Sequence, residues 1–477
     1  MNGERPMDSL KEKTAKGIAW GAVNNGALQA LNLALGIVLA RRLSESDYGI
    51  LALLTIFTSL AGCIQAAGFS QALANLRPPT HRDYSAVFWF NIMAGFAIYA
   101  VLFAAAPLIA RFFRLPELTD VSRLTFLCIP ASALGIVPNA KLWIELRQRE
   151  QAIAAIVSLA VSGCVGIWLA YHGYAYWSLA WQQLLFVTIG MAMKWAFTRW
   201  RPLLPVDMGP IRGMVRFSYK MLLTNMLTVV SQNVLTFIFG KLLPIGTVGQ
   251  WGQANKWNTM GSSLISNTMH QVAQPVLTRA AGETGRQERV FLAMMRFTAF
   301  VSFPLMFGLA LVAHEFIVLT IGEKWQPCVP LLQVLCAGGA FLPLHTLYQN
   351  FIISRGRSGI YLRCMALMIV LQTGLSLSLA PLGVMAMVTA FSALNVTFTV
   401  CWHIALSRVA PLPMGAAARA VAPFLISAAA AMAATWAMTS WVEGLTARLA
   451  LRMAIAALLY LAAIRLLKPD LPKLDRR

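Results

Sequence analysis

Residues 85–110 of the chain read SAVFWFNIMAGFAIYAVLFAAAPLIA, a run of 26 residues without a charged side chain. At a rise of about 1.5 Å per residue, an α-helix of this length exceeds the ~30 Å hydrocarbon core of a membrane. Charged residues bound the run, with Arg82 and Asp83 before it and Arg111 after it. The stretch therefore predicts a transmembrane helix.

The composition extends this prediction to the whole chain of 477 residues. Hydrophobic residues make up 58% of the chain and charged residues 12%, and the mean hydropathy is +0.65. Soluble domains carry about 25% charged residues, so this chain has too few polar side chains to cover a soluble fold of its size. The composition excludes a soluble enzyme and predicts a polytopic membrane protein.

Apolar runs bounded by charged residues, proline and glycine divide the chain into fourteen candidate spans joined by short loops. Because lipid offers no partner to a free backbone group, each span is expected to be an α-helix. The predicted fold is an all-α membrane bundle of about fourteen transmembrane helices. The spans cover residues 17–40, 49–73, 85–110, 121–140, 152–171, 176–197, 217–240, 248–275, 294–316, 328–353, 360–380, 383–406, 419–440 and 448–466.

The cations in the loops predict the orientation of the chain. With the amino terminus inside, 29 of the 39 Lys and Arg residues fall on inner segments and ten on outer segments. Cytoplasmic loops carry such an excess of cations, so both termini are expected in the cytoplasm. The net charge of +21 then needs no nucleic-acid partner.

The two halves of the chain resemble each other. A shift of 200 residues superposes Asn25 on Asn225 and Asn32 on Gln232. Parallel repeats are typical of transporters, with the substrate path between the halves. The expected segments are a cytoplasmic amino-terminal segment (1–16), a six-helix bundle (17–200), a cytoplasmic linker (201–216), a second six-helix bundle (217–407), helices 13 and 14 (419–467) and a cytoplasmic tail (468–477).

Polar side chains gather on one face of three predicted spans, 17–40, 217–240 and 248–275. In the last of these they recur at every third or fourth position, and a track of that length facing lipid would be costly. The track is therefore predicted to line a water-filled substrate cavity, whereas interhelical hydrogen bonding is the alternative for any single residue. The candidate cavity residues are Asn25, Gln29, Asn32, Asn225, Gln232, Asn255, Lys256, Thr259, Ser263, Ser266, His270 and Gln274.

Two of these residues are open to two interpretations. Lys256 lies about two turns inside the outer end of its span, where it either snorkels to the interface or binds an anionic head group. His270 is either a titrating switch or a hydrogen-bonded packing residue.

The 18 acidic residues indicate what the chain does not do. None falls at the midpoint of a predicted span, and Glu315, at the outer end of the span 294–316, comes nearest. A cation exporter usually needs a buried carboxylate. The chain also has no P-loop, no GxSxG or HExxH motif, and no CxxC pair among its seven cysteines. We therefore expect no catalytic residue, no metal site and no cofactor.

A string of short motifs runs through the first 180 residues. The motifs are LARRLSxxDYG at 39–49, GFSQAL at 68–73, AVFWFN at 86–91, APLIARFF at 106–113, LGIVP at 134–138 and WSLAWQQ at 177–183. In this string the chain resembles the Wzx-type flippases of the colanic-acid-exporter kind, a polysaccharide-exporter branch of the multidrug/oligosaccharidyl-lipid/polysaccharide (MOP) superfamily.

The resemblance implies twelve to fourteen spans, two bundles and alternating access in the bacterial inner membrane. It also implies a substrate, undecaprenyl-pyrophosphate-linked oligosaccharide, and a place beside polysaccharide polymerase and glycosyltransferases. The resemblance carries no catalytic residue over to this chain. Two other functions stay open: a multidrug or cation antiporter of the same superfamily, and a membrane glycosyltransferase or ligase, which would need a longer outer loop with acidic residues.

Overall fold

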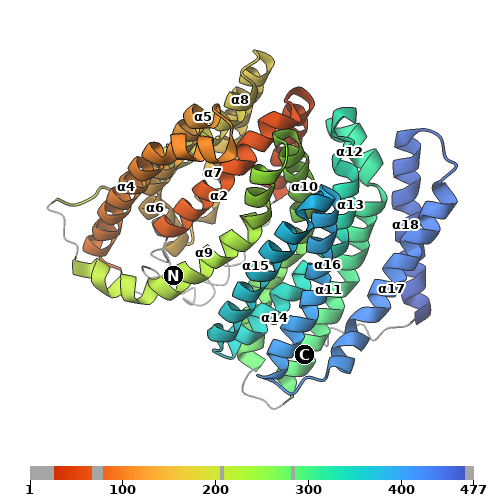
Figure 1. Ribbon diagram of the computed structural model, residues 1–477. Helices are drawn as coiled ribbons and strands as arrows, with labels where there is room; N and C mark the ends of the chain where they lie inside the picture. The colour runs from red at the N-terminus through yellow and green to blue at the C-terminus, as the bar shows by residue number, and fades with distance from the viewer. Residues whose placement is uncertain (1–25, 67–72, 74–78, 205–208, 281–284, 468–477) are drawn as a thin grey trace, which may run out of the picture. The chain divides into compact units, whose positions relative to one another are not determined.

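The computed structural model describes residues 26–66, 73, 79–204, 209–280 and 285–467 of the chain. The chain folds as two compact units, Met1–Asn233 and Val234–Arg477, and the boundary falls inside one long helix, α9 (Gly209–Leu242). Every regular element in the described ranges is helical, and none of these residues is in a β-strand. The predicted all-α membrane fold is confirmed (Figure 1).

The first unit contains a helix over residues 26–42 and the larger part of α9. Its other helices are α2 (Glu45–Ala66), α4 (His81–Phe113), α5 (Leu118–Phe126), α6 (Cys128–Ile144), α7 (Gln148–Tyr171) and α8 (Ala175–Thr198). Local capping explains two of their starts. Thr80 and Asp83 form a capping box at α4, and Ser44 bonds Asp47 in the same way at α2, so part of the 39–49 motif is a helix start.

Aromatic packing joins α4 to the end of α8 in the first unit. Phe88 of α4 is buried, and its ring lies 5.6 Å from that of Trp195 in α8 and 5.2 Å from that of Trp200. Edge-to-face pairs of this kind add stability beyond their buried area. The cluster fastens α4 to the end of α8.

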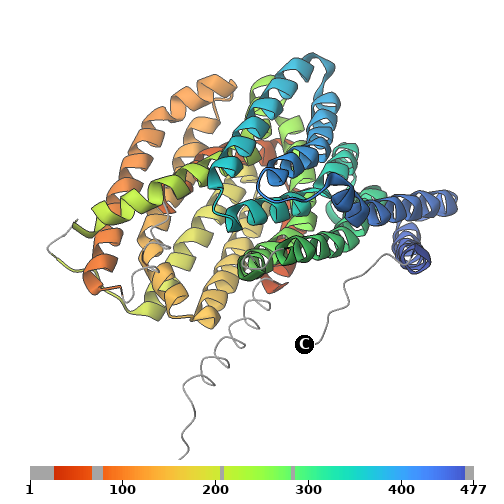
Figure 2. The same cartoon turned by 90° about the horizontal axis from the view of Figure 1, so that it is seen from below.

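The second unit holds the remaining helices, and its elements follow one another through short turns. They are α10 (Ile245–Arg279), α11 (Arg286–Leu311), α12 (Ala313–Ile321), α13 (Cys328–Gly339), α14 (Leu342–Ser354), α15 (Ser358–Leu379), α16 (Val384–Ser407), α17 (Met414–Thr439) and α18 (Leu445–Leu467). α10 packs on α13 and α14, while α17 packs along α11. α17 and α18 form a hairpin at one side of this unit (Figures 1 and 2).

Each of the fourteen predicted spans coincides with helix in the described part of the chain. Eleven of the described helical segments are long and apolar enough to cross a membrane, and residues 26–42, α8 and α10 are not among them. The count of fourteen, the segment boundaries and the side of each terminus stay predictions. Three spans were predicted too simply, because each contains the end of one helix and the start of the next: 121–140 passes from α5 to α6 at Leu127, 294–316 from α11 to α12 at Val312, and 328–353 from α13 to α14 at Ala340 and Phe341.

Candidate functional site

α10 is the most polar of the long helices. Its 35 residues extend over about 50 Å, which is more than enough to cross a membrane. One face is buried in the second unit through Trp251, Ala254, Ile265 and Met269. This apolar face fixes how the helix is packed in the second unit, where α10 contacts α13 and α14.

The predicted polar track lies on the helix face beside this buried apolar face. Asn255, Ser263 and Ser266 are half-buried, whereas Thr259 and Gln274 are exposed. Ser263 donates a hydrogen bond to the Met260 carbonyl of its own helix, at 3.2 Å. The structure thus brings these residues onto one continuous face, and their role as a cavity lining stays a prediction.

Lys256 borders this face. Its Nζ atom lies 5.8 Å from the ring centroid of Trp257, within the range of a cation–π contact. The Trp257 ring in turn meets Phe316 edge to face at 4.9 Å. Among the described side chains, Lys256 has no acidic partner within salt-bridge distance. Whether Lys256 snorkels to the interface or binds an anionic head group stays a prediction.

Three buried polar side chains on α10 were missed by the sequence reasoning. Both side-chain polar atoms of Gln253 lack a hydrogen-bond partner, as do Nε1 of Trp257 and Oδ1 of Asn258. All three side chains are at most 4% exposed. Buried polar groups are nearly always satisfied, so water or a ligand is the expected partner. The local sequence does not distinguish Gln253 and Asn258 from ordinary polar residues.

The remaining candidate residues lie in the first unit, apart from His270, which is on α10. In the first unit, Gln29 and Asn225 are half-buried, and Asn32 and Gln232 are exposed. Asn25 lies outside the described residues, and the side chain of His270 is likewise outside the described part. The structure leaves the grouping of these residues with the α10 track as a prediction.

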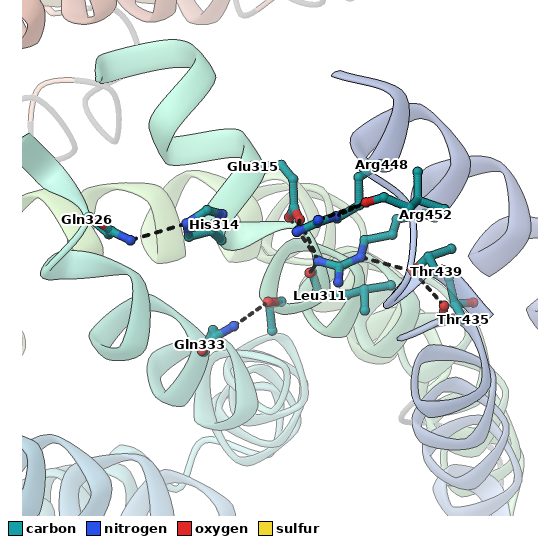
Figure 3. Close-up of polar contacts among 11 residues, drawn as sticks. Leu311, His314, Glu315, Gln326, Gln333, Thr435, Thr439, Arg448 and Arg452 are labelled. Atoms are coloured by element: carbon teal, nitrogen blue, oxygen red, sulfur yellow. Dashed lines mark hydrogen bonds and ion pairs between the residues drawn. The ribbon is translucent and has the colours of Figure 1, made fainter. Parts of the chain in front are cut away.

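A buried charge cluster, which the sequence reasoning missed, lies at the start of α12 (Figure 3). Glu315 is 0% exposed, and Nη1 of Arg452 in α18 donates to both of its carboxylate oxygens, at 2.8 and 2.9 Å. Nη1 of Arg448 lies 3.7 Å from Oε1 of the same carboxylate. Arg452 is only 7% exposed, although it is a charged residue.

This cluster explains how a membrane protein tolerates the buried acid. A carboxylate in a medium of low polarity is stable only when it is paired and hydrogen-bonded, and two guanidinium groups meet that need. Glu315 is consequently not a free carboxylate for a cation. The signal in the sequence was the spacing of four that places Arg448 and Arg452 on one face of a predicted span.

The described residues are helical in all their regular elements, contain eleven candidate spans and carry a polar face on one long helix, which together define a polytopic membrane protein of the transporter class. A family model described as "Polysaccharide biosynthesis protein" matches residues 38–330, and the chain belongs to this family. It is 22% identical over 356 residues to the lipopolysaccharide biosynthesis protein WzxC of Escherichia coli K12, covering 73% of this chain and 71% of that protein.

Two solved structures share the fold. The lipid II flippase MurJ in an inward closed conformation superposes with a TM-score of 0.74 at 13% identity, covering 95% of this chain and 99% of that one. An inward-facing multidrug transporter of the MATE family, in the MOP superfamily, superposes with a TM-score of 0.65 at 16% identity, covering 80% of this chain and 94% of that one. The fold is thus common to a lipid flippase and a drug transporter.

Proposed function

We propose that the chain is a flippase that moves undecaprenyl-pyrophosphate-linked oligosaccharide repeat units across the bacterial inner membrane. The units feed the biosynthesis of a surface polysaccharide, which is exopolysaccharide, capsule or O-antigen. Membership of the polysaccharide biosynthesis family over residues 38–330 is the observation that carries this proposal. The fold shared with a lipid II flippase supports a transport step in place of an enzymatic one.

The α10 track supplies the chemistry that such a substrate needs. Sugar hydroxyls require many hydrogen-bonding partners, which Asn255, Thr259 and Ser263 provide. The pyrophosphate requires positive charge, which Lys256 provides beside the track. Alternating access exposes this face first to the cytoplasm and then to the periplasm.

The setting of the protein follows from the same proposal. Both termini lie in the cytoplasm, as the excess of inner cations predicts. Glycosyltransferases build the substrate on the cytoplasmic leaflet, and a polymerase consumes it on the other side. Neither group of enzymes is required for the flipping step itself, because both act before or after it.

The test uses a chromosomal deletion complemented by the chain on a plasmid. We expect the deletion to abolish surface polysaccharide and to raise lipid-linked oligosaccharide on the cytoplasmic leaflet, measured by extraction and by its inaccessibility to periplasmic sugar-modifying enzymes. Plasmid expression should reverse both effects.

A multidrug antiporter of the same superfamily is the second candidate, because the fold accommodates both functions. The paired state of Glu315 disfavours this candidate, since that carboxylate is already occupied by Arg452 and Arg448. A deletion that leaves polysaccharide intact and raises sensitivity to cationic drugs would establish the antiporter and overturn the flippase.

A further inference from the structure

Pro304 lies inside α11 and leaves one backbone carbonyl of that helix without its usual partner. Proline has no N–H group, so the carbonyl four residues earlier, that of Phe300, receives no helical hydrogen bond. In a membrane such a carbonyl must find another donor, because lipid supplies none.

Tyr460 of α18 supplies that donor. Its hydroxyl donates to the Phe300 carbonyl at 2.8 Å, and its ring lies 5.9 Å from the Phe300 ring. Tyr460 is 4% exposed, so water does not compete for the bond. The hydroxyl therefore replaces the N–H that Pro304 lacks.

Arg452 supplies a donor at the second interruption of the α11 hydrogen bonds, the end of the helix. The helix ends at Leu311, and the carbonyls of a last helical turn have no partner within their helix. Nη1 of Arg452 donates to the Leu311 carbonyl at 3.0 Å while it also bonds Glu315, in the first turn of α12 (Figure 3). One guanidinium thus joins both sides of the break at Val312.

The contacts of Tyr460 and Arg452 both join α18 to α11. Leu311 follows Phe300 by eleven positions, while Arg452 precedes Tyr460 by eight, so α18 runs antiparallel to α11 and contacts it at two levels. The levels lie about 12 Å apart along α18. Both are points where the hydrogen-bond ladder of α11 is interrupted, and proline positions are where membrane helices bend.

We propose that α18 controls the bending of α11, with Tyr460 and Arg452 as positioning residues that fix its shape at Pro304 and at Val312. The consequence for transport rests on the proposed flippase function. During the transport cycle α11 bends at these two points, and the two donors set the relative populations of its straighter and its more bent conformation. The proposal that α11 bends does not depend on which substrate the protein transports.

The first unit contains a similar contact, in which a side chain of one helix donates to a carbonyl that a proline leaves unpaired in another. Pro138 in α6 frees the carbonyl of Leu134, and Nε1 of Trp195 in α8 donates to that carbonyl at 2.8 Å. A side-chain donor from a neighbouring helix is thus matched to a proline in each unit.

The test is a double-mutant cycle that returns the missing N–H. Tyr460→Phe removes the hydroxyl and keeps the ring, and Pro304→Ala restores an N–H for the Phe300 carbonyl. Spin labels on cysteines at Arg289 and Glu323, in a background without the native cysteines, report the distance between the ends of the α11–α12 segment. The purified protein is measured without substrate. Tyr348→Phe is the matched control, because its hydroxyl bonds the ring of His403 and not a backbone carbonyl.

We expect Tyr460→Phe to broaden or shift the distance distribution, with about a fivefold change in the ratio of the two shapes, the factor for one lost hydrogen bond. In the Pro304→Ala background the same substitution should have no further effect, whereas the effect of Tyr348→Phe should be equal in both backgrounds. An unchanged distribution for Tyr460→Phe, or an effect of equal size in both backgrounds, would overturn the proposal.

A transport measurement on the same variants distinguishes the two proposals. If transport of lipid-linked oligosaccharide falls with Tyr460→Phe and recovers with Pro304→Ala, the bending belongs to the cycle. If the distances respond as expected while the chain transports no such lipid, the flippase function fails and the control of α11 stands.

Discussion

Replacing Arg452 by methionine removes the central member of the buried charge cluster. Methionine keeps most of the length and apolar bulk of the side chain but none of its donors. The substitution deletes two hydrogen bonds to Glu315, one to the Leu311 carbonyl and one, at 3.2 Å, to Oγ1 of Thr439. Glu315 is left with Arg448 alone, 3.7 Å away.

The expected cost follows from burial. Removing one partner of a buried ion pair costs about 3–5 kcal/mol, and the remaining Arg448 places this case near the lower end, about 3 kcal/mol. For a unit of this size each kcal/mol lowers the unfolding midpoint by about 2–4 °C, so a drop of about 6–12 °C is expected. Thermal unfolding of the detergent-solubilised protein, followed by tryptophan fluorescence and size exclusion, measures this drop.

Two further variants decide whether the charge pair is the cause. Arg448→Met is the matched control: its side chain is 28% exposed and its Nε and Nη2 atoms bond the Val442 carbonyl, so its loss should cost about 1 kcal/mol or less. Glu315→Met combined with Arg452→Met removes both buried charges and should unfold at a higher temperature than Arg452→Met alone. An unchanged midpoint for Arg452→Met, or a double variant less stable than the single one, would refute the reasoning.

Three further predictions concern the membrane arrangement and the α10 track. Reporter fusions after Arg286 should report the cytoplasm and fusions after Gly444 the periplasm, because cations concentrate on inner segments; the reverse result would reject the topology. Cysteine at Thr259 should react with water-soluble thiol reagents while cysteine at buried Ala254 should not, and equal labelling of both would remove the cavity assignment. Lys256→Ala should slow capture of lipid-linked oligosaccharide several-fold more than Lys256→Arg, because a charge pair near a surface is worth about 4 kcal/mol or less at 4 Å. A silent Lys256→Gln would show that this cation only snorkels.

Much of the fold was predictable because the bilayer imposes a simple rule on sequence. A helix that crosses lipid must bury every backbone group internally and present apolar side chains, so long uncharged runs such as 85–110 mark helices directly. The rule finds α4, whose described bounds are His81–Phe113, and it finds α15 and α16 equally well. It depends on the chain locally and needs no knowledge of neighbours.

The same rule could not find the break inside the predicted span 294–316. Leu311, Val312 and Ala313 are all apolar. The polar His314 and Glu315 fall at the predicted end of the span, so hydropathy gives no signal of a break at Val312. The structure tolerates the break because Arg452, more than a hundred residues later, donates to the Leu311 carbonyl. Such a donor is a tertiary contact, and the local pattern of either segment carries no trace of the pairing.

The candidate site likewise contains residues that the local sequence predicts and residues that it does not. The α10 track was predictable, because helical spacing alone places Asn255, Thr259 and Ser263 on one face, and the structure has them there. The burial of Gln253 and Asn258 was not predictable, since both look like ordinary polar residues until the apolar face is packed. Periodicity identifies which residues share a face, whereas packing decides which of them lose water.

Lys256 and Glu315 show that the role of a charged residue in a membrane protein depends on the partners of its side chain. Both lie near the outer ends of their predicted spans, and sequence position treats them alike. Glu315 has two guanidinium partners and serves the architecture of α12 and α18. Lys256 has an indole ring beside it and no acidic partner among the described side chains, so its charge can still be neutralised by something that binds. A charge that the fold leaves uncompensated marks the place where an anionic substrate is to be sought.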